Sequence, residues 1–436
     1  MDRESPLAKR RVVVTGLGVV TPLGLDLEEN WQKALAGVSA IGRLTLAGTE
    51  RFPIQMAGAV SDESWKKIKS ALLNEATAEG ERRTLFALWA AQSAFSDAGL
   101  SAPAKNRHRF GVCLAAGLGI CALEDLYRWA LPKGGFDVVN FGRQREQVSR
   151  ESMIRNFSNR PAALIARRWG FGGLNCTITS ACASATQALG LAGRAIQRGE
   201  ADVVLAGGAD SMIHPFGLVG FALLAAAATG PHALCRPFDR KRSGLIIGEG
   251  AGVAVLEEQQ HALHRGARIY AELAGYGSSM DAYQVTAPHP RGDGAASCMR
   301  VALKDAALTP REIDYINAHG TGTKLNDLAE TLAIKGVFRE TARDIAISSS
   351  KSMIGHLMAA SGAPEFVFTV LSVQRDEIHP TINLENPDPK CDLDYVPNVK
   401  RSRRVAAALS NSFGFGGQNA SIVVKKYSQA AAPVAA

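Results

Sequence analysis

Short apolar runs, each ending at glycine or a polar residue, recur through the first part of the chain. Residues 12–15 form a β-branched run that is followed by Gly16 and Gly18. Such runs favour strands, and glycine commonly marks the turn after a strand. Further strands are expected at residues 112–116, 176–180, 202–206 and 252–257, and a helix of small residues at 183–198. Alternating strands and helices indicate an α/β architecture.

The second part of the chain repeats this pattern. Strands are expected at residues 269–274, 315–318, 345–348, 404–410 and 420–425, and helices at 294–307, 327–337 and from about 349 to 371. Each half closes with what looks like an antiparallel pair. We therefore predict an internal duplication rather than two unrelated domains.

The expected division places residues 11–260 in the first half and residues 266–426 in the second half. No linker rich in proline or serine separates them, so the halves should pack as one body. A polar, weakly periodic stretch at about 121–161 is interpreted as an insertion. The alanine-rich tail, residues 427–436, is expected to fray.

Composition narrows the class of protein. The chain has 436 residues, of which 46% are hydrophobic and 21% charged, as in ordinary globular proteins. No apolar stretch is long enough to span a membrane, and seven scattered cysteines without a CxxC pair favour a reducing, cytoplasmic location. The net charge of +8 favours an acidic partner. Nucleic acid is not expected, because basic and aromatic residues do not interleave.

Cys182 is the strongest candidate for chemistry. It lies in the sequence TSACASA at residues 179–185, where a strand is expected to pass into a helix of small residues. Backbone N–H groups and the helix dipole at such a position favour a thiolate, so a lowered thiol pKa is expected. The alternative is a buried cysteine that packs as a small hydrophobe, which is how the other cysteines are interpreted.

Two histidines follow other expected strands. His319 lies in the sequence NAHGTGT, where the hydroxyls of Thr321 and Thr323 could bind an amide-rich ligand arm. His356 closes the sequence SSSKSMIGH, five residues after Lys351. We expect Lys351, with Glu365 as a candidate partner, to order the histidine rings. The alternatives are a structural histidine that caps the next helix and a solvated surface lysine.

A glycine-rich sequence, NSFGFGG at residues 411–417, surrounds Phe415. We interpret it as a mobile loop whose N–H groups face an oxyanion, with a tight turn as the alternative. One cysteine with two histidines suggests a nucleophile and its polarising groups. No nucleophile-elbow serine motif, phosphate-binding loop or zinc-ligand spacing occurs, so no metal site is predicted.

Together these four motifs resemble those of the elongating β-ketoacyl-acyl carrier protein synthases, including type II polyketide ketosynthases. The resemblance extends to residues 11–24, 236–239, 248–252, 380–387 and 419–424, and so covers nearly the whole chain. It implies a thiolase-type fold, in which duplicated βαβαβαββ halves form a five-layered αβαβα sandwich. It also implies a homodimer, or a heterodimer with a related ketosynthase-like subunit.

The resemblance assigns roles to individual residues. The catalytic set is matched by Cys182, His319 and His356, together with the family lysine, Lys351. Glu365 matches the acidic companion of that lysine and has a supporting role. Phe415 matches a gating aromatic residue, and Thr321 and Thr323 match residues beside a phosphopantetheine arm.

The implied reaction is a decarboxylative Claisen condensation. An acyl group held on Cys182 and a malonyl-acyl carrier protein give a 3-oxoacyl-acyl carrier protein, in fatty-acid or polyketide chain elongation. This acyltransferase needs no cofactor beyond the carrier-borne arm. One alternative is a catalytically silent chain-length-factor subunit, which would lack the nucleophile. Another is a thiolase or initiating synthase that uses coenzyme A thioesters, against which the second histidine argues.

Carrier proteins are acidic, so a basic docking surface is expected near the site. The family often carries a basic residue after Gly220 and Phe221, where this chain has an apolar run. The expected replacements are Lys66, Lys67, Lys69, Arg82 and Arg83. The alternative is that these cations lie on solvated helix faces.

Overall fold

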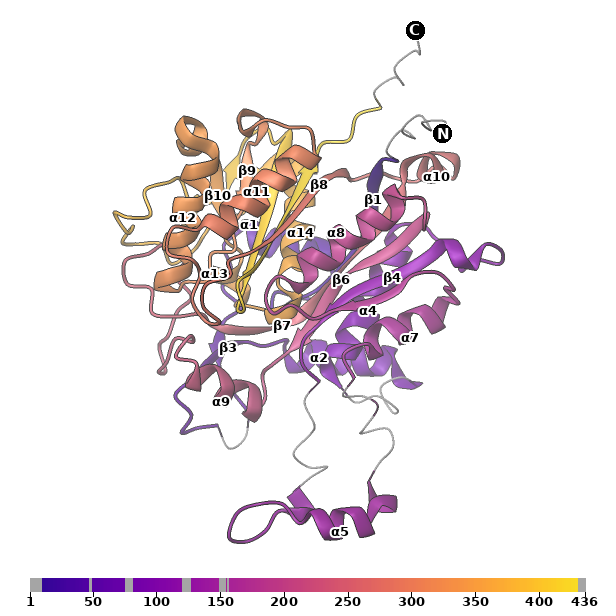
Figure 1. The fold of residues 1–436 in the computed structure, drawn as a ribbon, viewed down its shortest axis with the longest axis vertical. Coiled ribbons are helices and arrows are strands. Elements are labelled where there is room, and N and C mark those ends of the chain that lie inside the picture. Colours follow the sequence, from indigo (N-terminus) through magenta and orange to yellow (C-terminus); the bar gives the residue numbers. More distant parts are fainter. Residues whose placement is uncertain are drawn as a thin grey trace.

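The computed structural model describes residues 10–46, 49–74, 81–119, 127–148, 154 and 157–429. Its main sheet contains two sets of five strands with the same order and directions (Figure 1). The first set runs β5 (Asn175–Ile178), β4 (Phe110–Ala116), β6 (Val203–Ser211), β7 (Ile247–Glu258) and β1 (Val12–Val20). The second runs β10 (Ala346–Ser348), β9 (Tyr315–Asn317), β13 (Ala407–Gly414), β14 (Gln418–Lys425) and β8 (Ala271–Met280).

Strand directions repeat as well as strand order. The first two pairings of each set are parallel and the last two are antiparallel. The sets meet where β1 pairs with β8, through Val13 opposite Glu272 and Val14 opposite Ala271. This repeated topology confirms the predicted fold class of two duplicated halves.

Helices cover both sets of strands and fill the space between the two sets. α8 (Ser184–Gln197) and α14 (Gly362–Arg375) pack against each other and against strands of both sets, which makes them the central layer. α4 (Arg82–Asp97) and α7 (Arg160–Trp169) cover the first set, whereas α11 (Asp293–Asp305) covers the second and packs against α12 (Lys324–Phe338). α14 is buried from Gly362 to Val373, as expected for a helix enclosed on all sides. The layers therefore form the predicted αβαβα sandwich.

Shorter elements surround the sandwich. They are α1 (Leu27–Leu35), β2 (Gly42–Arg43), β3 (Met56–Gly58), α2 (Asp62–Ala71), α5 (Val138–Arg143), α9 (Pro215–Leu223), α10 (Gln259–His264), α13 (Lys351–Ile354), β11 (Glu377–Ile378) and β12 (Arg401–Ser402). α5 belongs to the expected insertion and lies away from the sandwich in Figure 1. Parts of that insertion and residues 430–436 of the expected tail lie outside the described residues. Within the described ranges, no helix combines the length and apolar character needed to cross a membrane.

Several strands are longer than predicted, and close packing explains the extension of β7. β7 begins at Ile247 rather than at residue 252, because its glycines lie against the segment that leads into α14. A Cβ on Gly248 would lie 2.5 Å from the Ile354 carbonyl oxygen, and one on Gly252 would lie 2.7 Å from the backbone of Ala363. Glycine here marks a close approach rather than the end of a strand. β13 likewise continues to Gly414.

Candidate active site

Cys182 lies in the turn that joins β5 to α8, the strand-to-helix junction that the sequence predicts. Ala181 adopts a left-handed backbone conformation with φ of 49°, which is unfavourable for alanine and needs support from its surroundings. Ser184 gives that support, because its Oγ accepts from the Ser180 amide at 2.8 Å and donates to the Ala181 carbonyl at 2.6 Å. The turn thus fixes Cys182 at the start of the central helix, where its side chain is 8% exposed.

His319 follows β9, and a buried carboxylate fixes its backbone. Glu330 of α12 accepts from the amides of His319 at 2.9 Å and Gly320 at 2.8 Å. The edge of the His319 ring contacts Phe413, with ring centroids 5.8 Å apart. Sequence reasoning missed Glu330; the signal was an acid on the helix that follows the NAHGTGT sequence.

His356 lies between α13 and α14 and is tied to the first half of the molecule. Its amide donates to the Ile246 carbonyl at 2.7 Å, and its carbonyl accepts from the Gly248 amide at 2.8 Å. Its Nδ1 accepts from the Met358 amide at 3.0 Å. A nitrogen that accepts from an amide carries no proton, so the proton of the neutral ring is on Nε2. His356 therefore presents a donor to the site.

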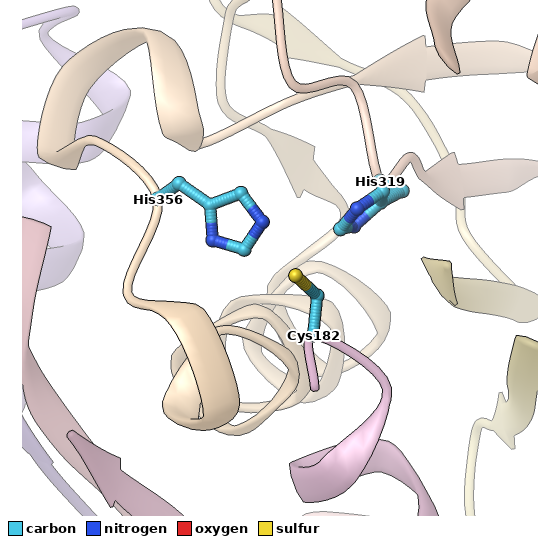
Figure 2. A group of neighbouring side chains, drawn as sticks. All are labelled: Cys182, His319 and His356. Carbon is cyan, nitrogen blue, oxygen red and sulfur yellow. The ribbon is translucent and has the colours of Figure 1, made fainter. Parts of the chain in front are cut away.

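The three side chains converge on one space (Figure 2). One ligand atom from each of Cys182, His319 and His356 lies within 4.8 Å of the others. The two imidazole centroids are 5.3 Å apart and the rings are nearly perpendicular. Burial, reinforced by the positive charge of Lys351, lowers the pKa of both histidines well below the usual value. Both rings are therefore neutral at physiological pH and can act as hydrogen-bond donors.

Lys351 and Glu365 form an ion pair beneath the histidines, as the sequence analysis expected. Lys351 Nζ donates to Glu365 Oε1, and both side chains are almost fully buried. Burial raises the pKa of Glu365 to about 7, although Lys351 opposes the shift. The alternative of a solvated surface lysine is wrong, because Lys351 has no exposed surface.

The predicted lowering of the Cys182 pKa is wrong for the resting thiol. Burial raises its pKa to about 11, while Lys351 and the Phe415 amide pull the pKa down less strongly. Removal from water disfavours the thiolate more than the helix terminus favours it. The thiol must therefore lose its proton as it attacks.

The glycine-rich sequence forms a tight hairpin, which is the alternative that the sequence analysis left open. Residues 411–414 belong to β13, and Gly414 already pairs with Gln418 at the start of β14. The Phe415 amide lies close enough to the Cys182 sulfur to pull the thiol pKa down. A Cβ on Gly414 would lie 3.1 Å from the Cys182 amide nitrogen, so glycine lets the strand end approach the nucleophile. The amides of Cys182 and Phe415 are thus available to one oxyanion.

A cavity of about 590 Å³ opens onto the three convergent side chains. Its wall includes Thr321 and Thr323, whose hydroxyl oxygens are 2.9 Å apart, and Phe415. The structure therefore gathers every predicted site residue: six line the cavity, and the buried Lys351 is close enough to lower the pKa of both histidines. The cavity wall also contains residues 284–288, which sequence analysis did not predict.

One thiol and two imidazoles are also the kinds of group that bind metal ions, and here they come from Cys182, His319 and His356. His356, however, has its proton on Nε2, because Nδ1 accepts from Met358. A protonated nitrogen has no free lone pair for a metal. This hydrogen bond leaves His356 without a free nitrogen lone pair for a metal ion. We therefore retain the prediction of no metal site.

The predicted docking surface needs correction at two positions. Arg83 is 2% exposed and donates to the Gly117 carbonyl at 2.8 Å. Arg82 pairs with the buried Glu249, with Arg82 Nε 3.0 Å from Oε2. Arg83 is therefore buried, whereas Arg82 remains partly exposed but is held by a buried carboxylate, because α4 packs directly on the first set of strands. Of the predicted cations, the exposed ones are Lys66, Lys67 and Lys69 on α2.

Comparisons with known families agree with this geometry. The model described as "Beta-ketoacyl synthase, N-terminal domain" matches residues 9–262, and the corresponding C-terminal domain model matches residues 270–385. The chain belongs to the β-ketoacyl synthase family.

Several members of the β-ketoacyl synthase family match along almost their whole length. The 3-oxoacyl-[acyl-carrier-protein] synthase 2 of Synechocystis is 42% identical over 97% of this chain and 99% of its own. A putative mitochondrial 3-oxoacyl-[acyl-carrier-protein] synthase of Schizosaccharomyces pombe is 42% identical over 96% of this chain and all of its own.

Solved structures give the same result. A type II polyketide synthase complex of a ketosynthase with its acyl carrier protein, AntDE:AntF, contains a chain that is 36% identical. The match has a TM-score of 0.87 over 97% of this chain and all of that chain. The ishigamide ketosynthase/chain length factor matches with 34% identity and a TM-score of 0.83, over 97% of this chain and all of that chain.

Proposed function

We propose that this β-ketoacyl synthase condenses an acyl group held on Cys182 with a malonyl group on an acyl carrier protein. The observation that carries the proposal is the convergence of one thiol and two neutral imidazoles at the end of a cavity. This arrangement supplies a nucleophile and two hydrogen-bond donors without a charged base.

The first half-reaction transfers the acyl group to the protein. The Cys182 sulfur attacks the thioester carbonyl, and the negative oxygen that develops accepts from the amides of Cys182 and Phe415. The carrier thiolate leaves and takes up the proton that Cys182 releases. Because burial raises the Cys182 pKa, this step should be faster at higher pH.

The second half-reaction forms the carbon–carbon bond. His319 and His356 donate to the carbonyl oxygen of the malonyl thioester, the carboxylate leaves as carbon dioxide, and its electron pair becomes the enolate. The enolate carbon attacks the acyl carbonyl on Cys182 and expels the thiolate, which takes a proton from solvent. The product is a 3-oxoacyl-acyl carrier protein. Thr321 and Thr323 bind the amide groups of the arm in this proposal.

The proposal is tested by separating the two half-reactions. Incubation with an acyl-acyl carrier protein should add one acyl mass to the peptide that contains Cys182, and malonyl-acyl carrier protein should then give a 3-oxoacyl product. A chain-length-factor role would show no acyl adduct. An initiating synthase would acylate Cys182 from coenzyme A thioesters and not from the carrier.

The proposed function also carries an expectation about the oligomeric state. We expect the protein to act as a homodimer or as a heterodimer with a related ketosynthase-like subunit, as in the relative described as a ketosynthase/chain length factor. Sedimentation of the purified chain, alone and after co-expression with such a subunit, distinguishes these assemblies.

A further inference from the structure

The cavity wall contains a basic side chain that the proposed chemistry does not use. Among the described residues that line the cavity, Lys324 is the one lysine or arginine and Asp281 the one acid. Asp281 is already satisfied, because it accepts from Asn419 Nδ2 at 2.8 Å and from the His289 amide at 2.9 Å. Lys324 is exposed and forms no ion pair with any part of the chain that the structure describes. The cavity wall therefore offers one ammonium group that has no ion-pair partner among the described residues.

The backbone that carries Lys324 is held firmly in place. Arg242 Nη2 donates to the Lys324 carbonyl at 3.2 Å, and its Nε donates to the Thr323 carbonyl at 3.0 Å. Arg242 is 4% exposed and is itself anchored by Asp388 at 2.7 Å. The backbone at Lys324 is therefore fixed, while its exposed side chain is free to turn toward a ligand. Lys324 directly follows the second threonine of the cavity wall.

The chemistry of the substrate arm indicates what this charge meets. A pantetheine arm carries its thioester at one end, amides along its length and a phosphate at the other end. With the thioester at Cys182 and the amides beside Thr321 and Thr323, the phosphate lies further out along the same wall. Lysine is a common phosphate ligand and acts as a point charge.

We propose that Lys324 binds the phosphate of the phosphopantetheine arm and gives the site its preference for phosphorylated arms. This inference rests on the proposed function and assigns a specificity-determining role to Lys324. The phosphate of a carrier-borne arm and that of coenzyme A are chemically alike, so the test must compare both sources.

The experiment measures the rate of Cys182 acylation from two small substrates, an acyl-pantetheine and the same acyl-4′-phosphopantetheine. The wild type should prefer the phosphorylated substrate by roughly two- to fivefold at low salt, the range expected for one exposed charge pair. Lys324→Gln should bring this ratio close to one, and Lys324→Arg should restore most of it. Lys304→Gln, which removes an exposed lysine from the outer helix α11, should keep the wild-type ratio.

Three outcomes would overturn the inference: a wild-type ratio of one, a Lys324→Gln ratio equal to that of the wild type, or an equal loss in the Lys304→Gln control. With larger substrates, Lys324→Gln should slow acylation from acyl-acyl carrier protein, and should slow any acylation from acyl-coenzyme A as well, because both arms carry this phosphate. A loss confined to acyl-coenzyme A would mean that the charge serves the coenzyme and not the carrier. Failure of the wild type to acquire any acyl group would instead refute the proposed function.

Discussion

The two halves of this molecule share a strand order but contribute different chemistry to one site. In the first half, the junction after β5 presents Cys182 at the start of α8. In the second half, the equivalent junction after β10 carries Lys351 and His356 ahead of α14. Equivalent turns of a duplicated fold therefore meet where the two central helices begin. One turn carries the nucleophile, and the other carries an imidazole and its supporting charge.

The surroundings of these turns differ as much as their side chains. The Cys182 turn depends on a strained alanine and one serine hydroxyl. The histidines of the second half rest on buried charged groups, Glu330 beneath His319 and the Lys351–Glu365 pair nearby. The comparison teaches that the nucleophile is positioned by backbone geometry, whereas the donors are held neutral by burial beside a fixed positive charge.

The largest effect is expected from loss of the nucleophile. Cys182→Ala should lower the rate of condensation by more than about 10³-fold, because the acyl group then has no covalent site on the protein. Product analysis by mass spectrometry checks this. An unchanged condensation rate would mean that another cysteine carries the acyl group.

Loss of either histidine donor should impair condensation and leave the acylation half-reaction intact. His319→Ala and His356→Ala should each reduce condensation by roughly 10²- to 10³-fold, the usual cost of removing one oxyanion donor. Acylation of Cys182 should persist in both variants, since its oxyanion uses backbone amides. Intact-mass measurements of the acyl adduct test the distinction, and loss of acylation together with condensation would contradict it.

The buried ion pair should matter more for stability than for either half-reaction. Lys351→Met leaves the buried Glu365 without its partner and should lower the free energy of unfolding by about 3–5 kcal/mol. The loss should increase as pH rises through about 7, the pKa of Glu365, because only the ionised carboxyl needs the lysine.

The matched control for that prediction is the double variant Lys351→Met/Glu365→Leu, which should recover much of the stability because no charge remains buried. Urea unfolding of both variants at pH 5.5 and pH 8 measures the effect. A cost that does not change with pH, or a double variant as unstable as the single one, would show that the pair acts through packing.

A smaller effect is expected at the β13–β14 hairpin, which belongs to the second half. Phe415→Ala should lower condensation by about tenfold or less and should weaken the order in which acyl and malonyl substrates react, because Phe415 lines the cavity beside acylated Cys182. Competition assays with mixed acyl and malonyl carriers measure the order. Unchanged rate and selectivity would argue against a gating role, and the conservative variant Phe415→Leu shows whether bulk alone suffices.

Local patterns predicted the elements and the site residues well, because a nucleophile after a strand or a histidine before a glycine turn is visible within a few positions. Features that depend on distant partners were not predictable. Glu330 supports a residue in another element, and Arg83 is buried against Gly117. The glycines of β7 allow contact with residues more than 100 positions further along the chain. The resting pKa of Cys182 was mispredicted for the same reason, since burial depends on how all layers pack.

The central claim is that the second half performs decarboxylation independently of the nucleophile. The most direct test is the release of carbon dioxide from malonyl-acyl carrier protein by Cys182→Ala and by Cys182→Ala/His356→Ala. We predict that the single variant still decarboxylates the substrate and that the double variant loses at least about 10²-fold of that rate. Equal rates in the two variants would contradict the claim.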